Sequence, residues 1–493
     1  MVTGWGDFKM FAQRFALVAI VVAFVVVDLG QFAVAQDKPA PVPAKTWNWS
    51  GAYIGGNVGY GVASSSVLES TAGLPAGPQV SANSANLNMS GVIAGGQIGY
   101  NWQATPYWLL GLEADFQWSG QRGSINSSNF FLAESVNASI RSFGTLRGRA
   151  GIITDDATLW YLTGGWAYGR IDLNLAATLA FGGPPAHANT IISNDVSGWT
   201  IGGGVETRIG GNWSGKIEYL YINFGSVSAT IPVAAGFVQQ TATVDIRDHI
   251  IRAGLNYHFG QPASAQDTAA AETRQAAGYN WSGIYAGANV GYGLANASVS
   301  EGISITALGQ ASVNSTDLSM MGAVVGGQIG YNWQPNMSNW LLGLETDFQW
   351  SGQRGSTTFA RTFVAPGSET VDASIRWFGT VRGRAGIVTD GTSLWYATGG
   401  LVYARTELSS ATSIVGVPPT FSSVANTVLG WTLGGGLEAH LRGNWSGKIE
   451  YLYLNLGNLA GATSLFAGAA QQNANMDVRD HIIRVGLNYR FGP

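Results

Sequence analysis

The chain has 493 residues, of which 25 are basic and 29 acidic, and charged residues make up only 11% of it. An ordinary soluble protein carries roughly 25% charged residues. Nucleic-acid binding needs an excess of basic residues, which the near-equal numbers of acids and bases exclude. Cysteine is absent, which excludes disulfides, thiolate metal sites and cysteine nucleophiles.

The first residues predict an export signal. Lys9 and Arg14 precede the apolar run Phe15 to Val27, and small residues at 33–35 offer a cleavage point. This order is typical of a secretory signal peptide, which we expect to span 1–35. The alternative is a membrane anchor, but the run is shorter than the ~20 residues that a spanning helix needs. Residues 36–47, with three prolines, are expected to form an extended leader.

The next segment, 48–260, reads as strands joined by alternately short and long connections. Short turns follow the second, fourth and sixth strands, and long loops follow the others. This plan is typical of a bacterial outer-membrane β-barrel. Eight strands are expected near 50–66, 90–104, 107–122, 136–153, 158–172, 196–209, 212–226 and 243–259.

Alternate residues of a strand point to opposite faces. In NWSGKIEYLYINFG (212–225), Lys216 and Glu218 therefore share one face, and Ile217, Tyr219 and Tyr221 share the other. A soluble sandwich would bury the apolar face between two sheets. Aromatic residues at both edges of an apolar band, on strands far longer than the usual 5–6 residues, favour lipid on that face and a charged interior.

The assignment of the two faces identifies two sets of candidate residues. The membrane-interface aromatics are expected to be Trp108, Trp118, Trp199, Tyr257, Phe259, Trp340, Trp350, Trp431, Tyr489 and Phe491. The interior polar network is expected to contain Glu113, Asp115, Arg141, Arg147, Arg149, Glu206, Arg208, Lys216, Glu218 and Arg252, with Glu345, Asp347, Arg376, Arg382, Arg384, Glu438, His440, Lys448, Glu450 and Arg484 in the second half. Charges away from water are costly unless paired, so we expect a packed polar interior rather than a pore.

The chain is duplicated. LLGLEADFQWSGQRGS (109–124) returns as LLGLETDFQWSGQRGS (341–356), and RDHIIRAGLNYHFG (247–260) returns as RDHIIRVGLNYRFG (479–492). The period is too long for a solenoid unit, so each copy should be a whole domain. Residues 261–280 are expected to form a flexible periplasmic linker, followed by the second barrel, 281–493. The predicted fold is all-β: two tandem eight-stranded, antiparallel up-and-down transmembrane barrels. The alternative is one sixteen-stranded barrel, which would enclose a water channel.

Several motifs occur in order in both copies. WSGAYIGGNVGYG (49–61), GQIGYNWQ, LRGRAGI (146–152), GGWAYG (164–169) and GLNYHF resemble those of the small outer-membrane barrel proteins of alphaproteobacteria, often called immunogenic or opacity-like surface proteins. The resemblance implies a porin-like barrel in the Gram-negative outer membrane, exposed to a host or the medium. Relatives include structural envelope proteins, adhesins and haemin binders. The chain departs from the group in fusing two barrels and in ending on Gly492 and Pro493 rather than on an aromatic residue.

The densest polar cluster is Asp245, Arg247, Asp248, His249 and Arg252, repeated at Asp477, Arg479, Asp480, His481 and Arg484. It could contact a ligand or haem at the outer rim. We prefer interface anchoring, because His249 lies ten residues before Phe259, about the height of the apolar band. Asn-Trp-Ser, at 48, 212, 280 and 444, is expected to place an interfacial tryptophan on the short-turn rim.

No arrangement of residues predicts catalysis, a metal site or a cofactor. The leading functional interpretation is a structural, surface-exposed outer-membrane protein whose expected partners are outer-membrane lipid and the barrel-insertion machinery. The alternatives are a binding protein for haemin or a host surface, and a diffusion pore.

Overall fold

The computed structural model describes residues 47–492. It leaves out 74–78, 129–131, 155–156, 180–185, 234–237, 260–278, 306–308, 336–337, 362–366, 390, 415–416 and 466–469. The predicted signal peptide (1–35), the leader (36–47) and the linker (261–280) lie outside the described residues, apart from Trp47 and residues 279–280. No helix within the described ranges is long and apolar enough to cross a membrane.

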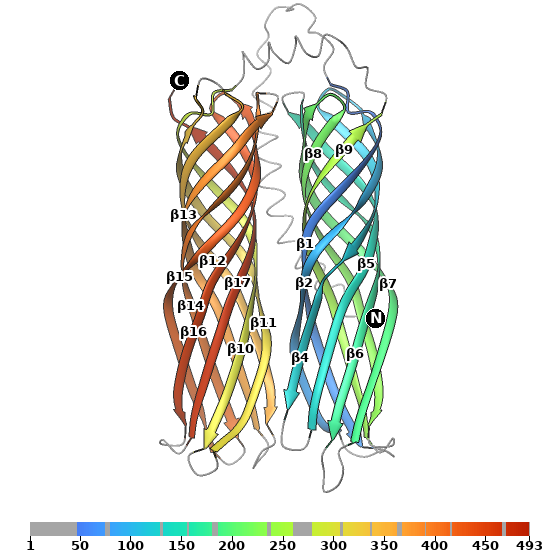
Figure 1. The fold of residues 1–493 in the computed structure, drawn as a ribbon, viewed down its shortest axis with the longest axis vertical. Helices are drawn as coiled ribbons and strands as arrows, with labels where there is room; N and C mark the ends of the chain where they lie inside the picture. The colour runs from blue at the N-terminus through green and yellow to red at the C-terminus, as the bar shows by residue number, and fades with distance from the viewer. Residues whose placement is uncertain are drawn as a thin grey trace, which may run out of the picture. The chain divides into compact units, whose positions relative to one another are not determined.

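Each copy is a ring of antiparallel strands, which Figure 1 shows as two closed barrels. The first copy contains β1 (Gly51–Gly73), β2 (Gln79–Gln103), β3 (Trp108–Ser119), β4 (Arg122–Ser128), β5 (Leu132–Thr154), β6 (Thr158–Leu179), β7 (Ala186–Gly210), β8 (Trp213–Val233) and β9 (Val238–His258). The second contains β10 (Gly283–Ile305), β11 (Gly309–Trp333), β12 (Trp340–Arg361), β13 (Gly367–Thr389), β14 (Ser393–Ile414), β15 (Val417–Arg442), β16 (Trp445–Leu465) and β17 (Ala470–Arg490).

The closing pairs show that there are two rings. β1 pairs with β9 from Tyr53↔His258 to Gly73↔Val238, and β10 pairs with β17 from Tyr285↔Arg490 to Ile305↔Ala470. Each copy therefore joins its own first and last strands, and no described edge is left unpaired in either ring. The prediction of two tandem barrels is confirmed, and the sixteen-stranded alternative is wrong. β3 and β4 together occupy the place that the single strand β12 occupies in the second copy.

The strands are longer than predicted. Residues 67–89 were expected to form a long loop, but β1 continues to Gly73 and β2 begins at Gln79. In the second copy the corresponding strands are equally long, since β10 runs to Ile305 and β11 starts at Gly309. An apolar band needs only about ten residues of each strand. The expected loops are thus largely extensions of the strands.

β-bulges lie where the strands leave this band. A bulge adds one residue to one strand and so exchanges the two faces beyond it. In β5 the register shifts between Ile140 and Ser142, and in β8 between Asn223 and Gly225, whose φ of 73° suits glycine. In β5 the even-numbered residues 136–140, which precede the bulge, face inward. After the bulge the odd-numbered Arg147 and Arg149 face inward instead.

Candidate functional site in the barrel interior

A buried group of charged residues fills the half of the first barrel next to the short turns, and we call it the polar tier. It consists of Glu113, Asp115, Arg147, Arg149, Glu206, Lys216, Glu218 and Arg252, each at most 7% exposed. Arg147 contacts Glu113 through Nη2, Asp115 Oδ2 at 3.0 Å and Glu218 Oε1 at 3.0 Å. Arg252 Nη2 lies 2.9 Å from Asp115 and 2.6 Å from Glu218.

The remaining bases join the same network. Lys216 Nζ donates to both carboxylate oxygens of Glu113 at 2.9 Å. Arg149 Nη2 reaches Glu206 Oε2 at 2.6 Å. Four carboxylates therefore face four bases, so the tier is neutral as a whole. Shared, hydrogen-bonded pairing of this kind is what makes buried charge tolerable.

Uncharged side chains add further hydrogen bonds to the carboxylates of the tier. Tyr53 donates to Glu113 Oε2 at 2.7 Å, Tyr161 to Glu218 Oε1 at 3.0 Å and Thr145 to Asp115 Oδ2 at 2.7 Å. Ser214 and Asn256 both donate to Glu206 Oε1, at 2.6 and 2.7 Å. The Arg149 guanidinium also lies over the Tyr161 ring, 4.2 Å from its centroid. Each described carboxylate is thereby held from several strands at once.

The second barrel repeats this arrangement. Its polar tier consists of Glu345, Asp347, Arg382, Arg384, Glu438, Lys448, Glu450 and Arg484, all at most 4% exposed. Arg484 Nη2 lies 2.9 Å from Asp347, and Arg384 Nη2 lies 2.8 Å from Glu438. Tyr285 takes the role of Tyr53, donating to Glu345 Oε2 at 2.7 Å. Two copies of one neutral network indicate that the whole set was duplicated together.

Four predicted network members lie elsewhere. Arg141 and Arg376 face outward, with side chains 56% and 46% exposed, because each sits in the bulge of its strand. Arg208 lies at the short-turn rim, where its Nε points to Gly211 O at 3.4 Å, and His440 lies at the same rim of the second copy. Without Arg141 and Arg208, the predicted set of the first copy has four acids and four bases in the lumen.

Glycines make room for the long side chains of the tier. A Cβ at Gly59 would lie 2.7 Å from the Cβ of Arg252, and one at Gly99 would lie 2.3 Å from the Tyr53 hydroxyl. Real Cβ atoms do not approach so closely, so side chains at these two positions would displace the network. Glycine on the inward face of β1 and β2 is thus a packing requirement of the polar tier.

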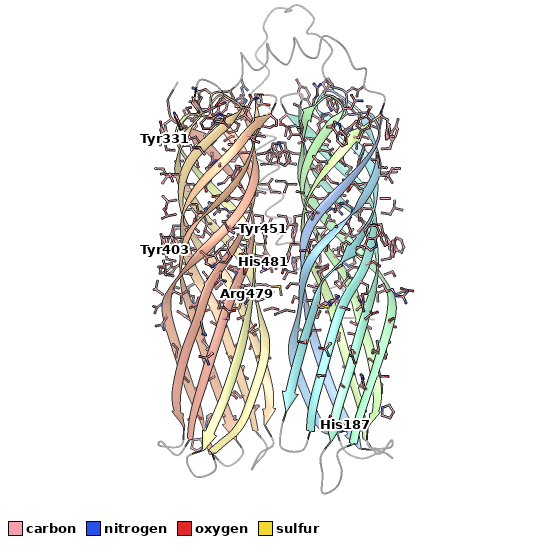
Figure 2. The ribbon with its side chains drawn as sticks, in the orientation of Figure 1. His187, Tyr331, Tyr403, Tyr451, Arg479 and His481 are labelled. Carbon is pink, nitrogen blue, oxygen red and sulfur yellow. The ribbon has the colours of Figure 1, made fainter. Side chains whose placement is uncertain are left out.

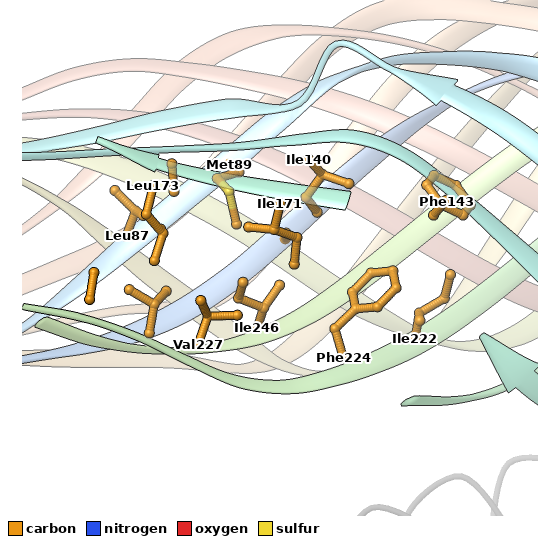
Figure 3. Close-up of a cluster of buried hydrophobic side chains, with 14 of the residues drawn as sticks. Leu87, Met89, Ile140, Phe143, Ile171, Leu173, Ile222, Phe224, Val227 and Ile246 are labelled. Atoms are coloured by element: carbon orange, nitrogen blue, oxygen red, sulfur yellow. The ribbon is translucent and has the colours of Figure 1, made fainter. Parts of the chain in front are cut away.

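Apolar side chains fill the other half of the lumen, which we call the apolar tier. Figure 3 shows Leu87, Met89, Ile140, Phe143, Ile171, Leu173, Ile222, Phe224, Val227 and Ile246 gathered between the strands, and all are at most 4% exposed. The second copy has a matching cluster that includes Met320, Phe378, Leu454 and Ile482. This tier was not predicted, because a strict period of two that is continued through the bulges assigns the wrong face to the residues beyond them.

A polar pair lies where the two tiers meet. Gln121, between β3 and β4, donates through Nε2 to Asp248 Oδ1 on β9 at 2.7 Å. Gln353 and Asp480 repeat the contact at 2.8 Å. The glutamine side chain passes over Gly61, where a Cβ would come within 2.4 Å of it. This contact ties the interrupted strand to the strand that closes the ring.

Tryptophan packs at the short-turn mouth of each lumen. Trp49 and Trp281 are 0% and 2% exposed, and their backbone N–H groups donate to Gln103 and Gln334 Oε1 at 3.0 Å. The Asn-Trp-Ser motif was expected to place interfacial tryptophans. That holds for the outward Trp213 and Trp445 but not for Trp49 or Trp281, which precede β1 and β10 and are buried.

The cluster from Asp245 to Arg252 does not form one site. Asp248 and Arg252 face inward, whereas Asp245, Arg247 and His249 face outward, as strand alternation requires. His249 Nδ1 lies 2.8 Å from the Tyr219 hydroxyl, and its ring packs edge-on to Tyr221 at 5.1 Å. A ligand that needs all five residues together has no place to bind.

Aromatic side chains ring each barrel at two heights. Trp108, Phe259, Trp340 and Phe491 lie on the outward face near the short turns, and Trp118, Trp350 and Trp431 at the other edge of the apolar band; all are at least 45% exposed. Trp199 contacts Tyr221 at the outer edge, and Tyr257 and Tyr489 contact Phe259 and Phe491 near the turns. Figure 2 shows both heights in the second barrel: Tyr331 near the turns, and Tyr403, Tyr451 and His481 at the other edge.

The outward face becomes polar beyond this edge. Arg141 Nε donates to Asp172 Oδ2 at 2.6 Å, and Ser193 donates to Asp172 Oδ1 at 2.7 Å. The hydrogen bond from Ser193, together with Arg141, lowers the pKa of Asp172, so that the carboxylate is ionised at neutral pH. Ser228–Thr243 and Thr230–Thr241 form hydroxyl pairs across β8 and β9, both at 3.0 Å. The described strand extensions thus have an apolar inside and a mainly polar outside, with Ile191 and Phe421 as exposed apolar exceptions.

The described residues contain no group of three or more His, Asp or Glu placed to hold a metal ion.

Comparison with known proteins gives one family. The family model described as "Outer membrane protein beta-barrel domain" matches residues 29–259 and again 268–491. The 31 kDa outer-membrane immunogenic protein of Brucella melitensis is 32% identical over 245 residues, which is 49% of this chain and 98% of the relative. The 22 kDa outer membrane protein of Rhizobium leguminosarum bv. viciae is 32% identical over 130 residues, 26% of this chain and 51% of the relative.

Solved structures give weaker likenesses. Neisserial surface protein A is 15% identical, with a TM-score of 0.19, and the match covers 43% of this chain and 98% of that one. A Pseudomonas aeruginosa FadL homologue is 11% identical, with a TM-score of 0.26, over 90% of this chain and 91% of that one.

Proposed function

Because this chain belongs to the family of outer-membrane protein β-barrel domains, we propose that it is a non-enzymatic structural protein of the outer membrane whose two closed barrels expose rigid hairpins to the outside. In this family the apolar face meets lipid, and the short turns lie on the periplasmic side. The strand extensions beyond the outer aromatic ring then form the exposed part. The relatives named as immunogenic agree with an exposed surface.

The occupied lumen supports a scaffold rather than a channel. The polar tier and the apolar tier lie in series along each barrel, and their described side chains are almost wholly buried. An ion crossing the barrel would have to break the ion pairs of one tier and then enter an apolar layer, where an unpaired charge is very costly. Eight strands also enclose only enough space for side chains, whereas sixteen leave an aqueous channel.

Planar-bilayer recording of the full chain tests this proposal. We expect no steady conductance steps, because both tiers block each lumen. Large, long-lived steps that scale with salt concentration would show an open pathway and would contradict the scaffold. Heat-modifiable migration of the same preparation shows whether the barrels have folded. An absence of conductance steps can then not be due to unfolded protein.

The haemin-binding alternative is not favoured by any contact that we observe. His249 bonds to Tyr219 and His258 lies 2.8 Å from Ser214 Oγ, so each of these imidazoles already has a hydrogen-bond partner.

A further inference from the structure

The basic residues of the first copy fall into three places. Residues 48–259 contain nine. Four belong to the polar tier, and Arg208 lies at the short-turn rim. The other four, Arg122, Arg141, Arg170 and Arg247, face outward, and we call them the arginine belt. No basic residue of this segment lies elsewhere on the outward face.

The belt directly follows the outer aromatic ring. On the outward face, Arg170 is the next residue after Tyr168 on β6, and Arg247 is the next after His249 on β9. Arg122 follows Trp118 after the break between β3 and β4. This is the level at which lipid headgroups meet a membrane protein, since interfacial aromatics mark the boundary of the hydrocarbon.

The second copy repeats all four positions, as Arg354, Arg376, Arg405 and Arg479. Figure 2 shows Arg479 beyond His481 on the side away from Tyr331, next to the ring that contains Tyr403. The Arg479 side chain is 59% exposed. The belt is therefore a property of both barrels.

Three belt arginines lie on consecutive strands. Arg122 on β4 pairs with Ser139 of β5, and Arg170 on β6 pairs with Ser142 of β5, beside the bulged Arg141. In the second copy, Arg354 pairs with Ser374 and Arg405 with Trp377, beside the bulged Arg376. Each barrel thus carries an arginine triad, defined as Arg122, Arg141 and Arg170 or their repeats.

Neighbouring acids orient the guanidinium groups without neutralising them all. Arg141 and Arg376 use Nε for Asp172 and Glu407, at 2.6 and 2.7 Å, so that the N–H bonds of both Nη groups are available to a further acceptor. Two acids lie beside the first triad: Asp172, and Asp195, which is opposite Arg170 in the β6–β7 pairing. Three arginines and two aspartates give this group a net charge of plus one. An oriented guanidinium binds phosphate through parallel hydrogen bonds.

We propose that the two arginine triads dock the phosphate groups of lipid headgroups in the outer leaflet. The outer bulge of β5 and of β13 has a role in this: it turns Arg141 and Arg376 out of the lumen and places them between their neighbours. If these arginines served only to form ion pairs between strands, they would have no reason to gather at the level of the lipid headgroups.

Native mass spectrometry of the full chain in detergent tests the proposal, with diphosphoryl lipid A as the probe and the same lipid without phosphates as its control. R141Q/R376Q removes one guanidinium from each triad, and we expect it to weaken diphosphoryl lipid A binding about fivefold, the equivalent of ~1 kcal/mol for one basic residue at a charged lipid surface. R141Q/R170Q/R376Q/R405Q should weaken it more than twentyfold, and raised salt should weaken the wild type.

R208Q/R442Q is the matched control, because it removes one arginine per copy from the opposite rim; it should leave binding unchanged. Heat-modifiable migration shows that each variant is folded. Equal binding of the phosphate-free lipid, or equal losses in R141Q/R376Q and R208Q/R442Q, would overturn the proposal. Displacement of the lipid by inorganic phosphate at equal concentration would also overturn it, since the triad would then be a site for free anions.

Discussion

Glu218 shows how strongly the charges of the polar tier depend on one another. It contacts Arg147 at 3.0 Å and Arg252 at 2.6 Å, accepts a hydrogen bond from Tyr161, and lies 3.9 Å from Lys216. The cost of removing ions from water is offset only when every charge keeps a partner of opposite sign. Eight such residues within one lumen therefore act as a unit, and the removal of one leaves an uncompensated charge.

We expect Glu218→Gln to lower the free energy of unfolding of the first barrel by about 3–5 kcal/mol, because it leaves a net positive charge in the buried network. Urea unfolding in lipid vesicles, followed by tryptophan fluorescence, measures the change. Asp245→Asn is the matched control: it also turns a carboxylate into an amide, but in the partly exposed pair with Arg247, where the loss should stay below ~1 kcal/mol. Equal losses in the two variants would contradict a cooperative network.

Each strand meets two environments, and it adapts either through a bulge or through a change of composition. Between the aromatic rings a strand faces lipid outside and charge inside, and beyond them it faces water outside and an apolar tier inside. Along β9 the composition changes while the parity is kept, since Arg252, Ile250 and Ile246 all face inward. Along β5 the parity itself changes, at the bulge that contains Arg141. A bulge and a change of composition therefore lead to the same lumen, which has one charged tier and one apolar tier.

Deletion of Arg141 should remove the bulge and turn Ile140 and Ala138 toward water, because a shift of one residue exchanges the faces of a strand. We expect a much smaller folded fraction in refolding experiments scored by heat-modifiable migration. Arg141→Ser keeps the number of residues and should fold like the wild type. If the deletion variant folds as efficiently as the substitution, the bulge is not what sets the inward face of this strand.

Ring closure predicts that each copy can fold independently. β9 returns to β1 and β17 returns to β10, so the backbone hydrogen bonds of a barrel are satisfied within its own copy. A spanning sheet with open edges would leave unpaired backbone groups in lipid, which is very costly. Each polar tier is also neutral within its own copy, so neither lumen needs charges from the other.

Residues 47–260, produced alone, should therefore refold into detergent and show heat-modifiable migration like the full chain. The comparison can be made in one gel, with residues 279–493 as the companion fragment. A fragment that stays unfolded while the full chain folds would mean that closure within one copy is insufficient for stability.

The local pattern already indicated much of this architecture. Alternation with a period of two assigned the outward aromatics and placed Glu113, Arg147, Lys216 and Arg252 on one face, and the repeated motifs revealed two copies. These features are local, since side-chain direction along a strand needs no knowledge of distant residues. The apolar tier was missed, although the inward series of β9 contained a signal for it in Ile250, Ile246 and Val244.

The amino-acid sequence thus determined the strands, the face that meets lipid, and the duplication. Only the tertiary structure decided that the rings close separately, that Arg141 and Arg376 leave the lumen, that Trp49 and Trp281 enter it, and that the interior changes from charged to apolar. The physical reason is that closure, bulges and tiers depend on the register between strands far apart in the chain, and hydrophobic alternation does not specify that register once an extra residue is inserted.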